Sequence, residues 1–170
     1  KTLEHAGYHF EAADASLELL MRRATGWCND FFELESFRVA VEHRPDRSAG
    51  GAEQNLRGHL AGVETEATIK IHVEGERIVA TGEGNGPVNA LDAALRTAIA
   101  GRFPRLDRVR LTDYKVRILD SAAATGAVTR VLIDASDGDT RWTTIGVSEN
   151  IIEASWQALA DSMVYALLRA

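Results

Sequence analysis

The chain has 170 residues, of which 45% are hydrophobic, which suits one ordinary domain with an appended segment. Its formal net charge of −6 argues against a nucleic-acid partner, because the cationic surface that binds phosphates is missing. No apolar run approaches the roughly 20 residues of a membrane span, and a single cysteine, Cys28, excludes an internal disulfide framework and fits a cytoplasmic protein.

The first part of the chain predicts a helix, a strand and a loop. Residues 12–24 have the spacing of an amphipathic helix. Its expected apolar stripe consists of Leu17, Leu20, Met21 and Ala24. Apolar and polar residues alternate over 33–43, which predicts a half-buried strand. The polar, Gly-rich stretch 44–66 predicts a long mobile loop.

The middle of the chain predicts a hairpin followed by a helix. Residues 68–73 and 77–82 alternate on either side of Gly75, which is typical of an antiparallel hairpin. Pro87 suits the first position of a helix, where its missing N–H costs nothing, and the apolar pattern continues to about residue 102.

The last third repeats this order. Strands are expected at 114–118, 128–135 and 141–147, with a turn at 137–139 and a helix over 150–168. Trp142 and Trp156 are expected to fill the core of this second unit, whereas Trp27 would face a neighbour of the leading helix.

A duplication with an offset of 64 positions relates the two parts, as Gly82 and Gly146 each end a strand and precede a helix. The helices share an apolar register, in which Val88, Leu95, Ile99 and Phe103 match Ile152, Leu159, Met163 and Leu167. The pattern predicts an α+β fold, with a leading helix followed by two β-β-β-α units that have antiparallel sheets and a pseudo-twofold relation.

The turn over 82–87 is a candidate anion site, because glycines tolerate positive φ and allow a ligand to approach the backbone. Both duplicated helix starts could hold a small anion on free N–H groups. In the first, a carboxylate would meet the N–H groups of Gly84, Asn85, Gly86 and Val88. The alternative is a tight turn without a ligand. A dinucleotide site is not expected, since Pro87 replaces the required third glycine.

A second candidate lies at Asp113 and Tyr114, where the carboxylate could accept from an ammonium group and the ring could form a wall. The alternative is an exposed aspartate beside a core tyrosine. Asn150, after Glu149, is expected to cap the last helix.

No catalytic or metal site is expected in this chain. His5, His9 and Glu11 have metal-ligand spacing, but no third ligand follows at a convincing distance. A nucleophile elbow, a P-loop and a Cys–His pair are also missing. Because the chain begins without methionine and in mid-pattern, we expect a binding or regulatory piece of a longer polypeptide, without a cofactor of its own.

Five segments carry a family resemblance. They are GYHFEAADASLELLMRR (7–23), FFELESFRV (31–39), GEGNGPVNALDAALR (82–96), LTDYKVRILD (111–120) and TIGVSENIIEASWQALADSMVYALLR (144–169). Together they resemble the C-terminal part of citramalate synthases, within the 2-isopropylmalate synthase/homocitrate synthase superfamily. The joint occurrence of GxGNGP and GVSxNIIEASW is specific, and the ASW stretch is more similar to the citramalate branch.

The resemblance implies a longer enzyme. Its N-terminal TIM barrel would use a divalent metal to condense acetyl-CoA with a 2-oxo acid such as pyruvate, and this chain alone would be inactive. Residues 1–30 would belong to a linker subdomain. Residues 31–170 would form a LeuA-type dimerisation and allosteric domain, with units at about 31–105 and 106–170.

The resemblance also implies a homodimer that binds a branched-chain amino acid, isoleucine or leucine, for feedback inhibition. The effector would lie at the dimer interface beside the Gly-rich turn, so Gly84, Asn85, Gly86 and Val88 carry over as site residues. Asp113, Tyr114, Ile151 and Ile152 are assigned by their position in the duplicated unit. The alternative is a purely structural dimerisation module that binds no effector.

Overall fold

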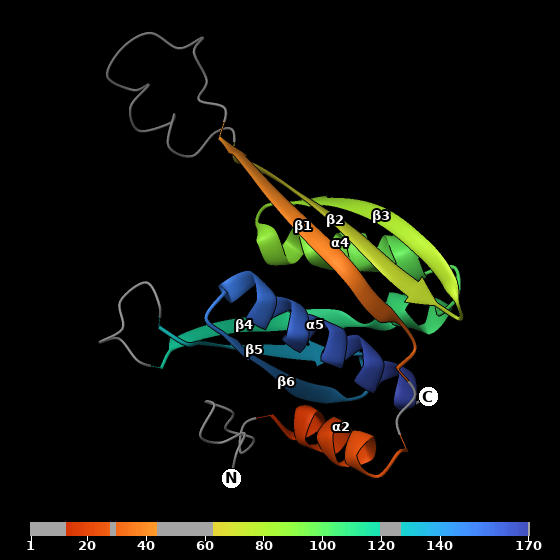
Figure 1. Cartoon of the computed structure of the whole chain (residues 1–170). Coiled ribbons are helices and arrows are strands. Elements are labelled where there is room, and N and C mark those ends of the chain that lie inside the picture. The colour runs from red at the N-terminus through yellow and green to blue at the C-terminus, as the bar shows by residue number, and fades with distance from the viewer. Residues whose placement is uncertain (1–12, 28–29, 44–62, 120–126, 170) are drawn as a thin grey trace, which may run out of the picture. The chain divides into compact units, whose positions relative to one another are not determined.

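The computed structural model describes residues 13–27, 30–43, 63–119 and 127–169 (Figure 1). The elements in chain order are α2 (Asp14–Ala24), β1 (Glu33–His43), β2 (Val63–Val73), β3 (Glu76–Gly84), α4 (Pro87–Ile99), η2 (Pro104–Arg108), β4 (Arg110–Ile118), β5 (Thr129–Ser136), β6 (Arg141–Ser148) and α5 (Ile151–Leu168). The predicted α+β order is confirmed, since a leading helix precedes two three-stranded antiparallel sheets that are each followed by a helix. The expectations for Cys28, the His5–His9 pair and most of the 44–66 loop lie outside the described residues.

The chain divides into two compact units. Phe32–Ile99 form one, here called the inserted unit, and Lys1–Phe31 with Ala100–Ala170 form the other, the terminal unit. The expected boundary between a linker subdomain and a regulatory domain near residue 30 stays a prediction.

In the inserted unit, α4 covers one face of the β1-β2-β3 sheet (Figure 1). The alternating residues Ile69, Ile71 and Val73 of β2 are fully buried beneath it, as the period of the strand predicts. The hairpin turns at Glu74 and Gly75, whose φ angles of 52° and 83° are those of a tight two-residue turn.

In the terminal unit, α5 packs against β5 and β6 (Figure 1). Trp142 and Trp156 are 2% and 4% exposed, which confirms their predicted place in this core. The Asp137 carboxylate accepts from the N–H groups of Asp139 and Thr140 at 3.0 and 2.8 Å, so the predicted turn between β5 and β6 is also confirmed.

The duplication is visible in how each sheet meets its helix. A Cβ atom on Gly82 would lie 2.7 Å from the carbonyl oxygen of Ala90, and one on Gly146 would overlap the carbonyl oxygen of Ala154. The two alanines follow their glycines at the same interval and are fully buried. Each unit therefore uses a glycine on its last strand to bring its helix close to the sheet.

The leading helix is correct as an element but buries a different face from the one predicted. Ala15, Ser16 and Leu19 are buried, whereas Leu17 and Met21 of the expected stripe are 39% and 56% exposed. The small residues let α2 approach β6, where the Ser16 hydroxyl accepts from Ile145 N–H at 2.9 Å. Packing against a strand edge, rather than the largest apolar side chains, sets the buried face.

Two boundaries differ from the sequence prediction. β2 begins at Val63, inside the predicted loop, because it pairs with the full length of β1. α4 ends at Ile99, so Phe103 lies outside the helix. Gly101 and Pro104 both oppose continuation, and Pro104 begins the short η2 helix that the sequence analysis missed.

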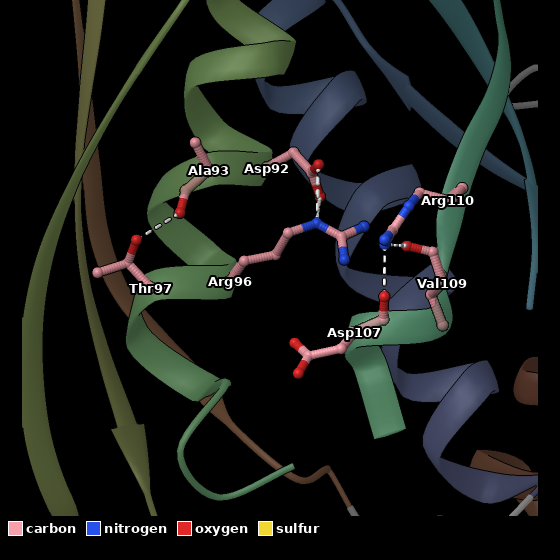
Figure 2. Close-up of polar contacts among 7 residues, drawn as sticks. All are labelled: Asp92, Ala93, Arg96, Thr97, Asp107, Val109 and Arg110. Carbon is pink, nitrogen blue, oxygen red and sulfur yellow. Dashed lines mark hydrogen bonds and ion pairs between the residues drawn. The ribbon is translucent and has the colours of Figure 1, made fainter. Parts of the chain in front are cut away.

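Polar contacts fix the local structure around these boundaries (Figure 2). Within α4, the Arg96 guanidinium holds the Asp92 carboxylate of the preceding turn at 2.9 Å. Beyond η2, Arg110 Nη1 donates to the carbonyl oxygens of Asp107 and Val109 at 2.5 and 3.1 Å. The first bond supports the last turns of α4, and the second pair holds the entry into β4.

Candidate functional site

The glycine turn before α4 is shaped by the helix itself. A Cβ atom on Gly84 would lie 2.5 Å from Asn89 Oδ1 and 2.6 Å from Ala90 N. Within the described part of the chain, the glycines with positive φ are Gly26, Gly75 and Gly138, so the expected positive φ in this turn is wrong. The close approach that glycine permits at position 84 is occupied by α4 rather than left open.

The start of α4 remains partly available. Asn85 N–H donates to Asn89 Oδ1 at 3.2 Å, so one of the four expected donors is already bound. Gly86 accepts from Ala90 N–H at 3.0 Å and has open space where a side chain would project. The N–H groups of Gly86 and Val88 come before the first helical hydrogen bond, and such groups have no partner within a helix. They are the donors left for a carboxylate.

An open groove of about 700 Å³ lies beside this turn in the inserted unit. It is lined by Ala40, Glu42, Glu64, Thr65, Glu66, Glu83, Gly84, Asn85 and Asn89. Four of these residues are glutamates and none is a lysine or arginine. Thr65 is 2% exposed, and among the described residues its hydroxyl has no hydrogen-bond partner.

The Asp113 carboxylate, expected as an ammonium acceptor, is already engaged. It lies 2.8 Å from the Lys115 ammonium and also accepts from Tyr114 N–H at 2.8 Å. The hydrogen bond from Lys115 holds the pKa of Asp113 below its ordinary value. A ligand ammonium would have to displace or share this contact.

Tyr114 links β4 to α5. Its hydroxyl lies 2.9 Å from Ser155 Oγ, which in turn donates to the Ile151 carbonyl oxygen at 2.6 Å. Because α5 packs on β5 and β6, the helix-side residues of β4 are left partly uncovered. They form the β4 apolar row, which consists of Tyr114, Val116 and Ile118 at 40%, 39% and 65% exposure.

The start of α5 is closed by its own cap. Asn150 Oδ1 accepts from the N–H groups of Ile152 and Glu153 at 2.8 and 3.3 Å. The predicted N-cap at Asn150 is therefore confirmed. The expectation that this second helix start is open to an anion is wrong, because the cap occupies the donors that an anion would use.

The eight predicted site residues fall into two groups. Gly84, Asn85, Gly86 and Val88 surround the start of α4, and Asp113, Tyr114, Ile151 and Ile152 lie in the terminal unit. Their role in binding stays a prediction. The sequence analysis missed Thr65, Glu66 and Asn89 around the first group. Thr65 and Glu66 were assigned to a loop, and only the period of β2 could have placed them on a strand.

Two general searches of the described ranges gave no further site. No helix there is both long and apolar enough to cross a membrane. No three His, Cys, Asp or Glu side chains in the described part come together as metal ligands would.

Comparison with known proteins places this geometry in a family. The model of the LeuA allosteric (dimerisation) domain matches residues 11–167. An (R)-citramalate synthase of Streptomyces coelicolor is 53% identical over 100% of this chain, and one of Aquifex aeolicus is 47% identical over 99% of it. A 2-isopropylmalate synthase of Parafrankia sp. is 30% identical over 72% of the chain. The chain spans 29%, 30% and 21% of the lengths of these three relatives. It belongs to the LeuA allosteric (dimerisation) domain family.

Proposed function

We propose that this chain is the regulatory part of an acetyl-CoA-dependent citramalate or 2-isopropylmalate synthase, where it dimerises and binds a branched-chain amino acid for feedback inhibition. The observation that carries the proposal is the match of the LeuA allosteric domain to residues 11–167, together with relatives named (R)-citramalate synthase. The condensation itself, and the divalent metal expected for it, would belong to a catalytic barrel outside this chain.

The start of α4 supports the binding of the effector's carboxylate. The N–H groups of Gly86 and Val88 lie at the positive end of a 13-residue helix, which favours a small anion. Isoleucine and leucine differ only in where the aliphatic chain branches, and a methylene in an apolar pocket changes binding by about 1–3 kcal/mol. Shape would therefore separate the two amino acids modestly.

Inhibition requires the effector to bind one arrangement of the parent enzyme better than another. A coupling free energy of about 1–3 kcal/mol would change activity by about 5- to 150-fold. The β4 apolar row supports dimerisation, because exposed apolar side chains on a sheet edge suit burial against a second copy of the same chain.

Calorimetry with isoleucine, leucine and valine tests effector binding on this chain. We expect saturable heat with at least one of the three. Heats equal to buffer for all three would favour a purely structural dimerisation module. An assay with acetyl-CoA and pyruvate should show no turnover by this chain alone.

A valine at position 86 tests the turn. Gly86→Val should fold normally because nothing lies within 4 Å of the new Cβ atom, yet its branched side chain would cover the neighbouring N–H groups. Gly101→Val is a matched control, since Gly101 also has open space and lies beyond the end of α4. Loss of binding in the first variant alone supports the turn, and equal affinity in both removes it from the site.

A further inference from the structure

We propose that the groove beside β3 and α4 recognises the ammonium group of the effector, using the Glu66 and Glu83 carboxylates and the Thr65 hydroxyl. This inference rests on the proposed function, which supplies an amino acid as the ligand. It adds the chemical requirement that the ligand carry a positive charge, so that an acid with the same carbon skeleton but no amino group would be rejected.

The charge of the groove is unbalanced. Glu66 and Glu83 are direct cross-strand partners in the β2–β3 register, and like charges in such pairs repel. No lysine or arginine lines the groove. At the other end of the same sheet, Glu35 is held by Arg77 at 2.6 Å, so a carboxylate on this sheet can be neutralised within the protein. A bound ammonium group would supply that neutralisation at the groove.

Thr65 gives an independent indication of a ligand. Its hydroxyl is buried and, within the described residues, unpartnered, and a buried polar group without a partner is unfavourable. Thr65 lines the groove and pairs with Gly84, the last residue of β3. An N–H donor of a ligand in the groove would complete the hydrogen bonding of this hydroxyl.

The end of β3 explains how these groups can act together. Neighbouring residues of a strand point to opposite faces, so Thr65 faces the helix side and Glu66 faces the other. Because β3 stops at Gly84, the groove reaches both sides of this corner of the sheet. Asn85 and Asn89, at the start of α4, line the same groove. A zwitterion could therefore direct its ammonium towards the glutamates and its carboxylate towards the helix.

The test compares two ligands in matched variants by calorimetry. The ligands are the branched-chain amino acid that binds the unaltered chain best and the carboxylic acid of the same skeleton without the amino group. The variants are Glu66→Gln and Glu83→Gln, and the control is Glu33→Gln at the opposite end of the sheet, where Glu33 pairs with His72. Each groove variant should weaken the amino acid about tenfold, as for a lost charge-assisted hydrogen bond. Affinity for the desamino acid should not fall.

A fourth variant, Thr65→Val, separates binding from folding. It removes an unpartnered hydroxyl at nearly constant volume, so its melting temperature should not decrease while its affinity for the amino acid does. If the unaltered chain binds the amino acid and Glu66→Gln, Glu83→Gln and Thr65→Val all retain that affinity, the groove is not the ammonium site, although the proposed function stands. Equal affinity of the unaltered chain for both ligands also overturns the inference. If it binds no branched-chain amino acid, the proposed function fails and the inference fails with it.

Discussion

The hydroxyl of Ser16 accepts a hydrogen bond from Ile145 N–H at 2.9 Å, joining the beginning of α2 to the outer edge of β6. Asp14 accepts from Thr143 N–H at 3.2 Å, and Gln157 of α5 accepts from Val147 N–H at 3.1 Å. Alternate N–H groups of this edge strand are thus satisfied by side chains. An unpaired edge is a template for pairing with another chain, and here it is covered.

Ser16→Ala should lower the free energy of unfolding by about 1–3 kcal/mol, because it leaves the buried N–H of Ile145 without an acceptor. Urea denaturation measures this difference. Thr97→Ala is the control, since the Thr97 hydroxyl donates to the Ala93 carbonyl oxygen on an exposed surface of α4 (Figure 2). Equal effects of the two substitutions would contradict a special role for the edge contact.

Alanine at the two glycines of the turn region should have opposite consequences. Gly82→Ala places a methyl group against the backbone of α4, and overpacking of this kind costs about 1–3 kcal/mol. Gly86→Ala meets no atom within 4 Å and should be neutral or slightly stabilising, since it restricts the unfolded chain. Thermal melts of both variants test the contrast. A stable Gly82→Ala protein would show that sheet and helix can separate without loss.

The Arg77 guanidinium lowers the pKa of Glu35 from 4.5 to about 2, and His72 adds a smaller contribution. Because the folded pKa is the lower one, the stability from this contact is complete above pH 4.5 and is lost as the pH falls towards 2. Arg77→Met should return the Glu35 pKa towards 4.5. Carbon-detected NMR titration of the Glu35 carboxyl measures the change, with Glu33 as an internal reference. A Glu35 pKa that does not move would assign the shift to another cause.

Asp161 behaves in the opposite sense. Burial raises its pKa above 3.8, although Arg23 at 2.8 Å opposes the shift. A raised carboxyl pKa means that stability falls as the pH rises from 3.8 through the folded value. Arg23→Met should extend that fall and lower stability at neutral pH by about 1–3 kcal/mol, with a smaller loss in acid. Denaturation at pH 7 and in acid tests this, and Arg23→Met with Asp161→Asn should recover part of the loss. A loss independent of pH would exclude the carboxylate as its origin.

If a second copy covers the β4 apolar row, Ile118→Asp should raise the dimer dissociation constant at least about tenfold, as for a central interface residue. Ile118 is 65% exposed in the single chain, so the substitution should not disturb the fold. Val79→Asp is the control, because Val79 is 52% exposed and lies in the other unit. Sedimentation equilibrium measures both constants. Dimers of equal strength would place the interface elsewhere.

The order of elements could be predicted from sequence because each has a clear period. β2 alternates around Ile69 and Ile71, and α4 begins at a proline that suits its first turn. The buried face of α2 could not be predicted in this way, since Leu17 and Met21 are larger than Ser16 yet are exposed. Which face is buried depends on a strand more than a hundred residues later in the chain.

The candidate site was predictable only in part, for a similar reason. Gly86 and Val88 lie in a recognisable local motif, and so does Glu83. Thr65 and Glu66 reach the same groove only through strand pairing with β3, and a polar sequence alone does not determine that pairing. The Asn85–Asn89 contact shows the reverse case, in which a local side chain occupies a donor that the backbone pattern alone leaves open.

The division of the chain has a consequence for its synthesis. Phe32–Ile99 are contiguous and can fold as soon as they leave the ribosome, but α2 belongs to the unit completed by Ala100–Ala170. The nascent helix must wait, without its final neighbours, until β6 and α5 have been translated. During that interval Leu19, fully buried in the finished protein, is exposed to chaperones and to other nascent chains.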